Sequence, residues 1–294
     1  MKNNLNFVDW FLLIFASILL GSNFVFISII VEEVPPLTTA GLRTLIALPF
    51  CYILMKYFRS ALPKKKKDWL ILMALGLLTA AIPFGSMAWG QQYIASGLSG
   101  IIYGTMPVIS VLLIPFFLKE EKFSKKKLIG ATIGLIGIIF LLLPSIINKS
   151  NYLTIGICIT FLAPISHTIG AIYTRINSKM HPSTLATGQM IFASIYLIIL
   201  SNIFEDQIEK IPSMNVILSI FWIGLSTALA FNLYFIVIKR IGAVRSSIIP
   251  LFFPVVAVIL GSILLKERLL ISSYLGLILI LYGAISVSGN KLQK

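Results

Sequence analysis

Residues 91–140 read QQYIASGLSGIIYGTMPVISVLLIPFFLKEEKFSKKKLIGATIGLIGIIF, and this stretch decides the fold because a degraded copy of it returns near the C-terminus. The copy, residues 238–287, reads IKRIGAVRSSIIPLFFPVVAVILGSILLKERLLISSYLGLILILYGAISV. Equivalent residues lie 147 positions apart as far as the glutamates and 146 positions apart beyond them. The matched pairs are Ile94 and Ile241, Ser99 and Ser246, Pro107 and Pro254, Glu120 and Glu267, Gly130 and Gly276, and Gly137 and Gly283.

The repeat extends upstream of this stretch. At a spacing of 146, the sequence pairs Pro36 with Pro182, Thr38 with Thr184, Ala40 with Ala186, and Arg43 with Gln189. A repeat of this length indicates that the chain was built by doubling a unit of roughly half its length. We therefore divide the chain into a first unit, residues 1–147, and a second unit, residues 152–294.

The composition is that of an integral membrane protein. Hydrophobic residues make up 58% of the 294 residues and charged residues 12%, and the mean hydropathy is +0.97. This leaves too little polar surface to cover a water-soluble globule. A helix needs about 20 apolar residues to cross a hydrocarbon core of about 30 Å. Ten runs of that kind follow one another, at about 9–31, 36–58, 68–89, 96–118, 127–146, 152–174, 183–204, 214–237, 243–265 and 272–289.

Each unit holds five runs, and an odd number reverses the direction in which the second unit enters the membrane. We therefore predict an all-α polytopic membrane protein of ten transmembrane helices, arranged as two inverted five-helix repeats. Such units can exchange conformations about a pseudo-two-fold axis in the membrane plane, with the substrate near mid-depth. Prolines at mid-membrane bend helices, so Pro107 and Pro254 predict two kinks or hinges at matched places.

The formal net charge of +14 does not indicate nucleic-acid binding, because the basic residues sort by loop and do not interleave with aromatics on one surface. With the N-terminus in the cytoplasm, 19 Lys and Arg residues lie on the inner side and four on the outer side. The positive-inside rule thus predicts a multi-pass protein of the inner (cytoplasmic) membrane with both termini in the cytoplasm. The protein is then surrounded by membrane lipid. The sequence leaves open whether it is a monomer or a homodimer.

Taken together, these features resemble one known family. The ten predicted spans form two inverted fives, Gly-Ser-Asn-Phe begins at Gly21 in the first helix, and Arg43 lies in the second. Both units end with an Ala-Ser, Pro, Glu, Gly, Gly pattern. These features resemble those of EamA-type members of the drug/metabolite transporter superfamily. The resemblance covers essentially the whole chain. It implies secondary transport, commonly export of amino acids or related metabolites, through a central cavity lined by both units. Many members carry a tryptophan before the first-helix glycine, where this chain has Leu20.

Arg43 is the one formally charged residue well within a predicted span. A charge at that depth is costly unless it is paired or faces water, which favours a cavity-facing cation that binds a carboxylate or phosphate. The alternative is that its long stem reaches the nearby outer interface and meets Glu32 or Glu33. For the functional interpretation, the sequence predicts that Arg43→Ala abolishes transport and that Arg43→Lys retains part of it.

Other polar residues within the spans are further candidates for substrate binding. Asn23 and His167 fall at roughly corresponding depth in the first and sixth helices, and His167 is also the candidate proton carrier, because imidazole titrates near neutral pH. For both residues the alternative is a hydrogen bond to a neighbouring carbonyl. The remaining candidates, which could equally join helices to one another, are Tyr103, Gln189, Asn232 and Tyr234.

All ten Asp and Glu residues lie at span ends or in loops. Coupling to protons or sodium through a buried carboxylate is therefore disfavoured, and facilitated diffusion or exchange is favoured. Glu120 and Glu267, which follow the fourth and ninth spans, are expected to cap the next helix or to pair with adjacent lysines.

A polytopic membrane enzyme would need paired carboxylates, a Ser/His arrangement or a metal cluster at mid-depth, and the spans contain none. We therefore expect no catalytic residues, no cofactor and no metal. The leading prediction is a transporter of small molecules, most plausibly an amino-acid exporter. The alternatives are another metabolite class (a nucleotide sugar, a drug-like cation, or uptake of a cofactor) and a membrane scaffold that does not transport.

Overall fold

The computed structural model describes residues 7–117, 125–147, 151–206, 208–241 and 249–288, and every regular element in these ranges is helical. The first unit contains α1 (Phe7–Ile30), α2 (Pro36–Tyr57), α3 (Lys66–Leu75), the π-helical segment η1 (Gly76–Ala81), α4 (Ile82–Gly90), α5 (Ser96–Tyr103), α6 (Met106–Phe117) and α7 (Lys125–Ile147). The second unit contains α8 (Asn151–Asn177), α9 (Pro182–Phe204), α10 (Met214–Ile241), α12 (Ile249–Leu264) and α13 (Ile271–Ser288).

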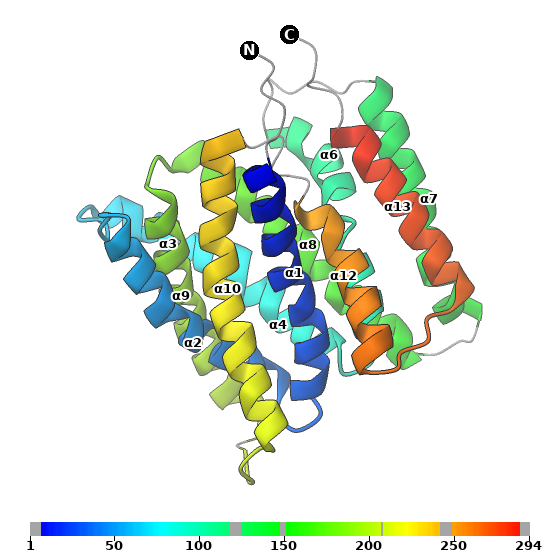
Figure 1. Cartoon of the computed structure of the whole chain (residues 1–294), viewed down its shortest axis with the longest axis horizontal. Helices are drawn as coiled ribbons and strands as arrows, with labels where there is room; N and C mark the ends of the chain where they lie inside the picture. Colours follow the sequence, from blue (N-terminus) through cyan, green and yellow to red (C-terminus); the bar gives the residue numbers. More distant parts are fainter. Residues whose placement is uncertain (1–6, 118–124, 148–150, 207, 242–248, 289–294) are drawn as a thin grey trace.

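Several of these helices have the length and composition of membrane spans. Among the described residues, five are long and apolar enough to cross a bilayer, namely Pro36–Tyr57, Lys66–Gly90, Asn151–Asn177, Pro182–Phe204 and Met214–Leu233. Shorter apolar helices cover Ile14–Ile30, Ile129–Phe140, Phe252–Leu264 and Ile271–Gly283. The predicted all-helical, polytopic architecture is confirmed, whereas the number of ten spans and their inverted order remain predictions. The start of α1 and the end of α13 lie at the same end of the bundle (Figure 1).

The two units are interleaved in space. Helix α2 packs on α9, α5 on α12 and α7 on α13, so these three pairs each join one helix from either unit. Helix α1 packs on α10 and on α12, while α4 packs on α8. In Figure 1, α7 and α13 stand side by side at one edge of the bundle, and α2 and α9 lie toward the other.

The predicted kink at Pro107 corresponds to a helix break. A proline ring clashes with the carbonyl four residues earlier, which here belongs to Tyr103, the last residue of α5. Gly104 and Thr105 separate α5 from α6. A Cβ atom on Gly104 would clash with the Pro254 ring of α12, so the break lets the two helices approach closely. Helix α12 itself runs through Pro254 without interruption.

The third span contains a π-helical segment that the apolar pattern did not predict. It ends just before Pro83, whose ring would crowd the carbonyl of Thr79 in a regular α-helix. The widened turn is held by neighbouring helices: Ser166 Oγ of α8 donates to the Leu78 carbonyl at 2.8 Å. Thr79 Oγ1 lies 2.9 Å from Gln189 Oε1 of α9 and donates to it. The irregular backbone is therefore satisfied inside the protein, as membrane depth requires.

The α7–α13 contact is made by glycines and is reciprocal. A Cβ atom on Gly137 would lie 2.8 Å from the Gly276 carbonyl oxygen, and one on Gly283 would lie 2.5 Å from the Gly130 carbonyl oxygen. Gly130 and Gly276, and likewise Gly137 and Gly283, are equivalent in the sequence repeat. Small residues thus let the backbones of α7 and α13 come into close contact.

Three glutamates fasten helices of one unit to the other at the end of the bundle where α1 finishes. Glu33, after α1, accepts from Ser213 N and Oγ at 2.7 Å each, just before α10. Glu205, after α9, accepts from the backbone N–H groups of Leu37 and Thr38 and from Thr38 Oγ1 at 2.6–2.9 Å, at the start of α2. The bonds from Ser213 hold the pKa of Glu33 below its usual value, so this contact persists at neutral pH and is lost only in acid.

The third glutamate corrects a prediction about capping. Glu267 accepts from Ser96 N at 2.7 Å and Gly97 N at 3.0 Å, so it caps α5 of the first unit and not the next helix, α13. Its repeat equivalent, Glu120, lies outside the described residues. We call the three contacts of Glu33, Glu205 and Glu267 the carboxylate clasps.

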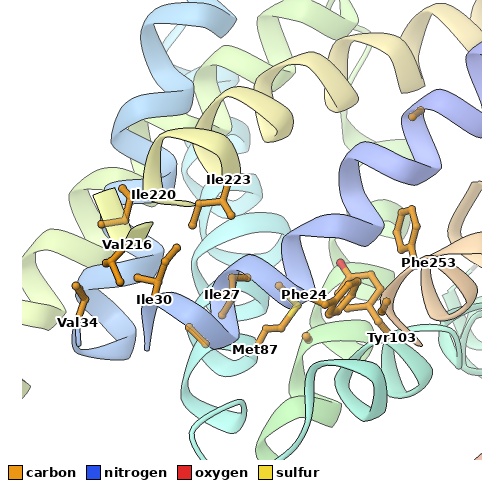
Figure 2. Packing of buried hydrophobic residues seen from close by; sticks show 14 residues of the cluster. Phe24, Ile27, Ile30, Val34, Met87, Tyr103, Val216, Ile220, Ile223 and Phe253 are labelled. Carbon is orange, nitrogen blue, oxygen red and sulfur yellow. The ribbon is translucent and has the colours of Figure 1, made fainter. Parts of the chain in front are cut away.

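An apolar cluster fills the bundle between the clasps and its centre. Figure 2 shows Ile30, Val34, Val216, Ile220 and Ile223 gathered where α1 and α10 come together, with Ile27 and Met87 following toward Phe24, Tyr103 and Phe253. The largest of these side chains are almost fully buried; Ile27 is 1% exposed and Ile223 is 0% exposed. This cluster closes the bundle on the side of the clasps.

Candidate functional site

A cavity lies at the centre of the bundle, next to this cluster. Its volume is about 70 Å³, enough for several water molecules. Ten of the described residues line it: Leu20, Phe24, Arg43, Phe84, Met87, Tyr103, Met106, His167, Phe231 and Phe253. The walls are therefore apolar and largely aromatic, and the polar groups come from three side chains, Arg43, Tyr103 and His167.

Much of the lining comes in repeat-related pairs. Phe84 and Phe231 lie 147 positions apart, as do Met106 and Phe253. This is the spacing that relates the two copies of the long repeat, so the cavity lies where equivalent parts of both units meet. The pairs supply matched apolar walls, whereas the charge does not follow the repeat: Arg43 lines the cavity and its equivalent, Gln189, does not.

Arg43 is held inside the bundle by α10 and α4. It is 3% exposed, and its Nε donates to Thr227 Oγ1 at 2.8 Å. Its Cζ lies 3.8 Å from the centre of the Phe84 ring, a cation–π contact. Its Nη1 is buried and has no hydrogen-bond partner among the described residues. The guanidinium is therefore fixed on two sides and keeps an unused donor.

The alternative placement of Arg43, at the interface beside Glu32 or Glu33, is not the observed one. The side chain is buried and bonds Thr227 inside the bundle, and Glu33 is engaged by Ser213. A buried, incompletely bonded guanidinium is expensive to retain in a membrane protein, which is typical of a group that meets an anionic partner.

Tyr103 and His167 form the second polar element of the cavity. The Tyr103 hydroxyl lies 2.8 Å from His167 Nδ1, a hydrogen bond between α5 and α8. The Tyr103 ring also packs edge-on against Phe24 at 5.8 Å between centroids, and on Phe253 at 6.0 Å. The helix break caused by Pro107 ends α5 at Tyr103, at the depth of the cavity. Pro107 therefore determines the position of the Tyr103 hydroxyl.

Three of the other predicted residues bond neighbouring protein groups and are not among the described residues that line the cavity. Asn23 Oδ1 accepts from Ser226 Oγ at 2.6 Å, which links α1 to α10. Gln189 accepts from Thr79, and Asn232 Nδ2 donates to the Ala228 carbonyl of its own helix at 2.8 Å. These residues fit the alternative interpretation, in which buried amides bond neighbouring groups. The backbone of Tyr234 lies in α10, and its side chain is outside the described residues.

The sequence did not identify the apolar walls or Thr227. Large apolar residues occur on every span, and most of them face lipid, so composition alone cannot select Phe84 or Phe253. Leu20 is different, because the family resemblance marks its position, and the structure places it in the cavity.

We expect Leu20→Trp to narrow the cavity and to select against bulky ligands. A Trp side chain fills space that Leu leaves open, so affinity should fall roughly tenfold for an aromatic carboxylate such as 3-phenylpropanoate and little for propanoate. Binding of both compounds to the purified protein measures this. The matched control is Ile18→Trp on the exposed face of α1, which should leave both affinities unchanged. Equal losses for the two ligands would contradict the prediction.

Comparison with known proteins agrees with this arrangement. The model of the EamA-like transporter family matches the chain twice, over residues 10–143 and over residues 154–289. Each match covers one of the two units defined by the internal repeat.

The chain is also similar to individual proteins along nearly its whole length. It is 25% identical over 273 residues to "Uncharacterized transporter YoaV" of Bacillus subtilis, covering 92% of this chain and 93% of that protein. It is 28% identical over 281 residues to "Uncharacterized inner membrane transporter YedA" of Escherichia coli, covering 93% and 88%. One solved crystal structure, with 16% sequence identity, has a TM-score of 0.68 and covers 94% of this chain and 96% of that chain, which shows the same fold.

Proposed function

The chain belongs to the EamA-like transporter family, and on this basis we propose that it is a secondary transporter of small carboxylate-bearing metabolites, amino acids or related compounds. The family match makes it a membrane transporter and not an enzyme. Net movement would be export across the cytoplasmic membrane by alternating access, with both termini in the cytoplasm.

The observation that carries the choice of substrate is the Arg43 guanidinium in an otherwise apolar cavity. A carboxylate is its natural partner, because a guanidinium binds carboxylates through charge-assisted hydrogen bonds. The buried Nη1 has no other partner in the described part of the protein. The same charge repels a drug-like cation.

Reciprocal contacts support alternating access by two inverted repeats. Gly41 packs against Leu197 of α9, and their repeat equivalents, Thr187 and Cys51, meet through a 3.0 Å hydrogen bond to the Cys51 carbonyl. The glycine contacts of α7 and α13 have the same reciprocity. Contacts of the form i to j and j to i are expected of a two-fold axis that relates the units.

A transport assay tests the proposal directly. The purified protein would be screened by thermal shift against amino acids and other metabolites, and each stabilising compound would be tested by counterflow in proteoliposomes. We expect the compounds that bind to carry a carboxylate and to exchange across the membrane. A set of binders without carboxylates, or binders that never exchange, would overturn the proposal.

His167 gives a separate prediction about the polar pair. His167→Gln should keep part of the flux, because a glutamine amide can still bond the Tyr103 hydroxyl, whereas His167→Ala should lose about tenfold more by removing this hydrogen bond between α5 and α8. Counterflow measures both. Flux recorded between about pH 5.5 and 8 tests proton carriage: a pH dependence present in the wild type and absent in His167→Gln would assign it to this imidazole.

A further inference from the structure

The proposed function leaves open which charge the transported compound carries. An amino acid presents a carboxylate and an ammonium group, whereas its deaminated relatives present the carboxylate alone. The cavity can distinguish these two forms, because each ionic group of a ligand must find a compensating group where water is scarce.

The fixed charge of the cavity is positive and has no negative counterpart at its depth. Arg43 is the lining residue that carries a formal charge. Every Asp and Glu in the sequence lies at a span end or in a loop. The three clasp glutamates, Glu33, Glu205 and Glu267, are already bonded at the end of the bundle, beyond the apolar cluster. A ligand ammonium in the cavity would therefore meet no carboxylate.

The neutral polar groups are poorly suited to replace that carboxylate. Tyr103 and His167 bond one another at 2.8 Å, so an incoming ammonium would compete with an existing hydrogen bond. Thr227 Oγ1 accepts from Arg43 Nε and itself donates to the Ile223 carbonyl. An ammonium would also lie in the same small cavity as the Arg43 cation and be repelled by it.

The rest of the cavity fits an uncharged, flat and polarisable group. Phe24, Phe84, Phe231 and Phe253 come from four helices, and Met87 and Met106 complete the wall. Aromatic rings stack or meet edge-on in such surroundings, and thioethers contact aromatic rings favourably.

From these observations we infer that the preferred ligand is a monoanion: a single carboxylate on an apolar body without an ammonium group. The inference rests on the proposed transport function and narrows its substrate class. Arg43 Nη1 supplies the donor for the carboxylate, and the phenylalanine and methionine wall encloses the body. Amino acids with the same side chain are the weaker ligands of the site.

Three probes with one apolar body and different charges test this. They are 3-phenylpropanoate (anion), phenylalanine (zwitterion) and 2-phenylethylamine (cation), titrated by calorimetry at pH 7.4 into the full-length protein in nanodiscs. A binding assay is used because weak acids cross lipid unaided. We expect 3-phenylpropanoate to bind at least about tenfold more tightly than phenylalanine, and the amine not to bind. Equal or tighter binding of phenylalanine, or measurable binding of the amine, overturns the inference.

An Arg43→Gln variant links the preference to the guanidinium. It keeps a polar side chain and removes the charge, so the affinity for 3-phenylpropanoate should fall at least about tenfold. Binding of 3-phenylpropanoate to Arg43→Gln with wild-type affinity overturns the inference. Exchange of phenylalanine in counterflow without binding of 3-phenylpropanoate refutes the inference and leaves the proposed function standing, whereas no binding and no exchange for any carboxylate refutes both.

Discussion

Proteoliposomes containing Arg43→Ala are expected to show no counterflow above protein-free liposomes, and those containing Arg43→Lys to retain a measurable fraction of wild-type flux. The Ala variant leaves the cavity with no charged group to attract a carboxylate. A charged hydrogen bond contributes about 1.5–3 kcal/mol, which corresponds to roughly a 10- to 150-fold loss of affinity before any loss of orientation. Lysine restores the charge as a single point, without the planar fork that bonds Thr227 and stacks on Phe84.

Stability distinguishes a binding residue from a structural one in this experiment. Because Arg43 keeps an unpartnered buried donor, Arg43→Leu should raise the thermal midpoint or leave it unchanged while it abolishes flux. Lys56→Ala is the matched control: it removes a positive charge from the exposed last turn of the same helix and should keep wild-type flux. Wild-type flux in Arg43→Ala would remove Arg43 from the site.

Gly283→Val is expected to have the largest effect on folding. A Cβ atom at this position would lie 2.5 Å from the Gly130 carbonyl oxygen and 2.8 Å from Gly134 N, and backbone atoms cannot move aside as a side-chain tip can. Helices α7 and α13 would have to separate, and overpacking of this kind costs about 1–3 kcal/mol or more. A lower thermal midpoint and a smaller monodisperse fraction in detergent measure the loss.

The control for this variant lies two residues away, on the exposed face of α13. Ile285 is 59% exposed, so Ile285→Val should leave the thermal midpoint within a degree or two of wild type. Because the described residues of α7 and α13 do not line the cavity, Gly283→Val protein that does fold should bind ligands as the wild type does. An unchanged midpoint would mean that the glycine contact does not hold this pair together.

Local chemistry made much of the fold predictable. The break after Tyr103 follows from a proline ring four residues later, and the glycine face of α7 follows from its spacing. The π-helical segment before Pro83 has the same kind of cause, but a proline near a helix start is compatible with several backbone solutions. Contacts from Ser166 and Gln189 select the observed one, and these contacts depend on packing that a linear pattern does not contain.

The charged residue of the site could be predicted from the sequence, whereas the apolar residues that line the cavity could not. Arg43 stood out because a charge is rare at that depth, whereas Phe84 and Phe231 look like lipid-facing residues until their helices are packed. Gln189 occupies the position equivalent to Arg43 and was expected in the site, yet it bonds Thr79 instead. Equivalence in a repeat fixes a place in the fold, and the side chain at that place decides whether it reaches the cavity.

The carboxylate clasps bear on what moves during a transport cycle. Each clasp joins a helix of one unit to a helix of the other, α1 with α10, α9 with α2, and α12 with α5. If the two units swung apart as rigid bodies, all seven clasp hydrogen bonds would break in one step. A pivot between mixed pairs would keep them intact, so we expect the rigid bodies of the proposed cycle to be helix pairs that each combine one helix from either repeat.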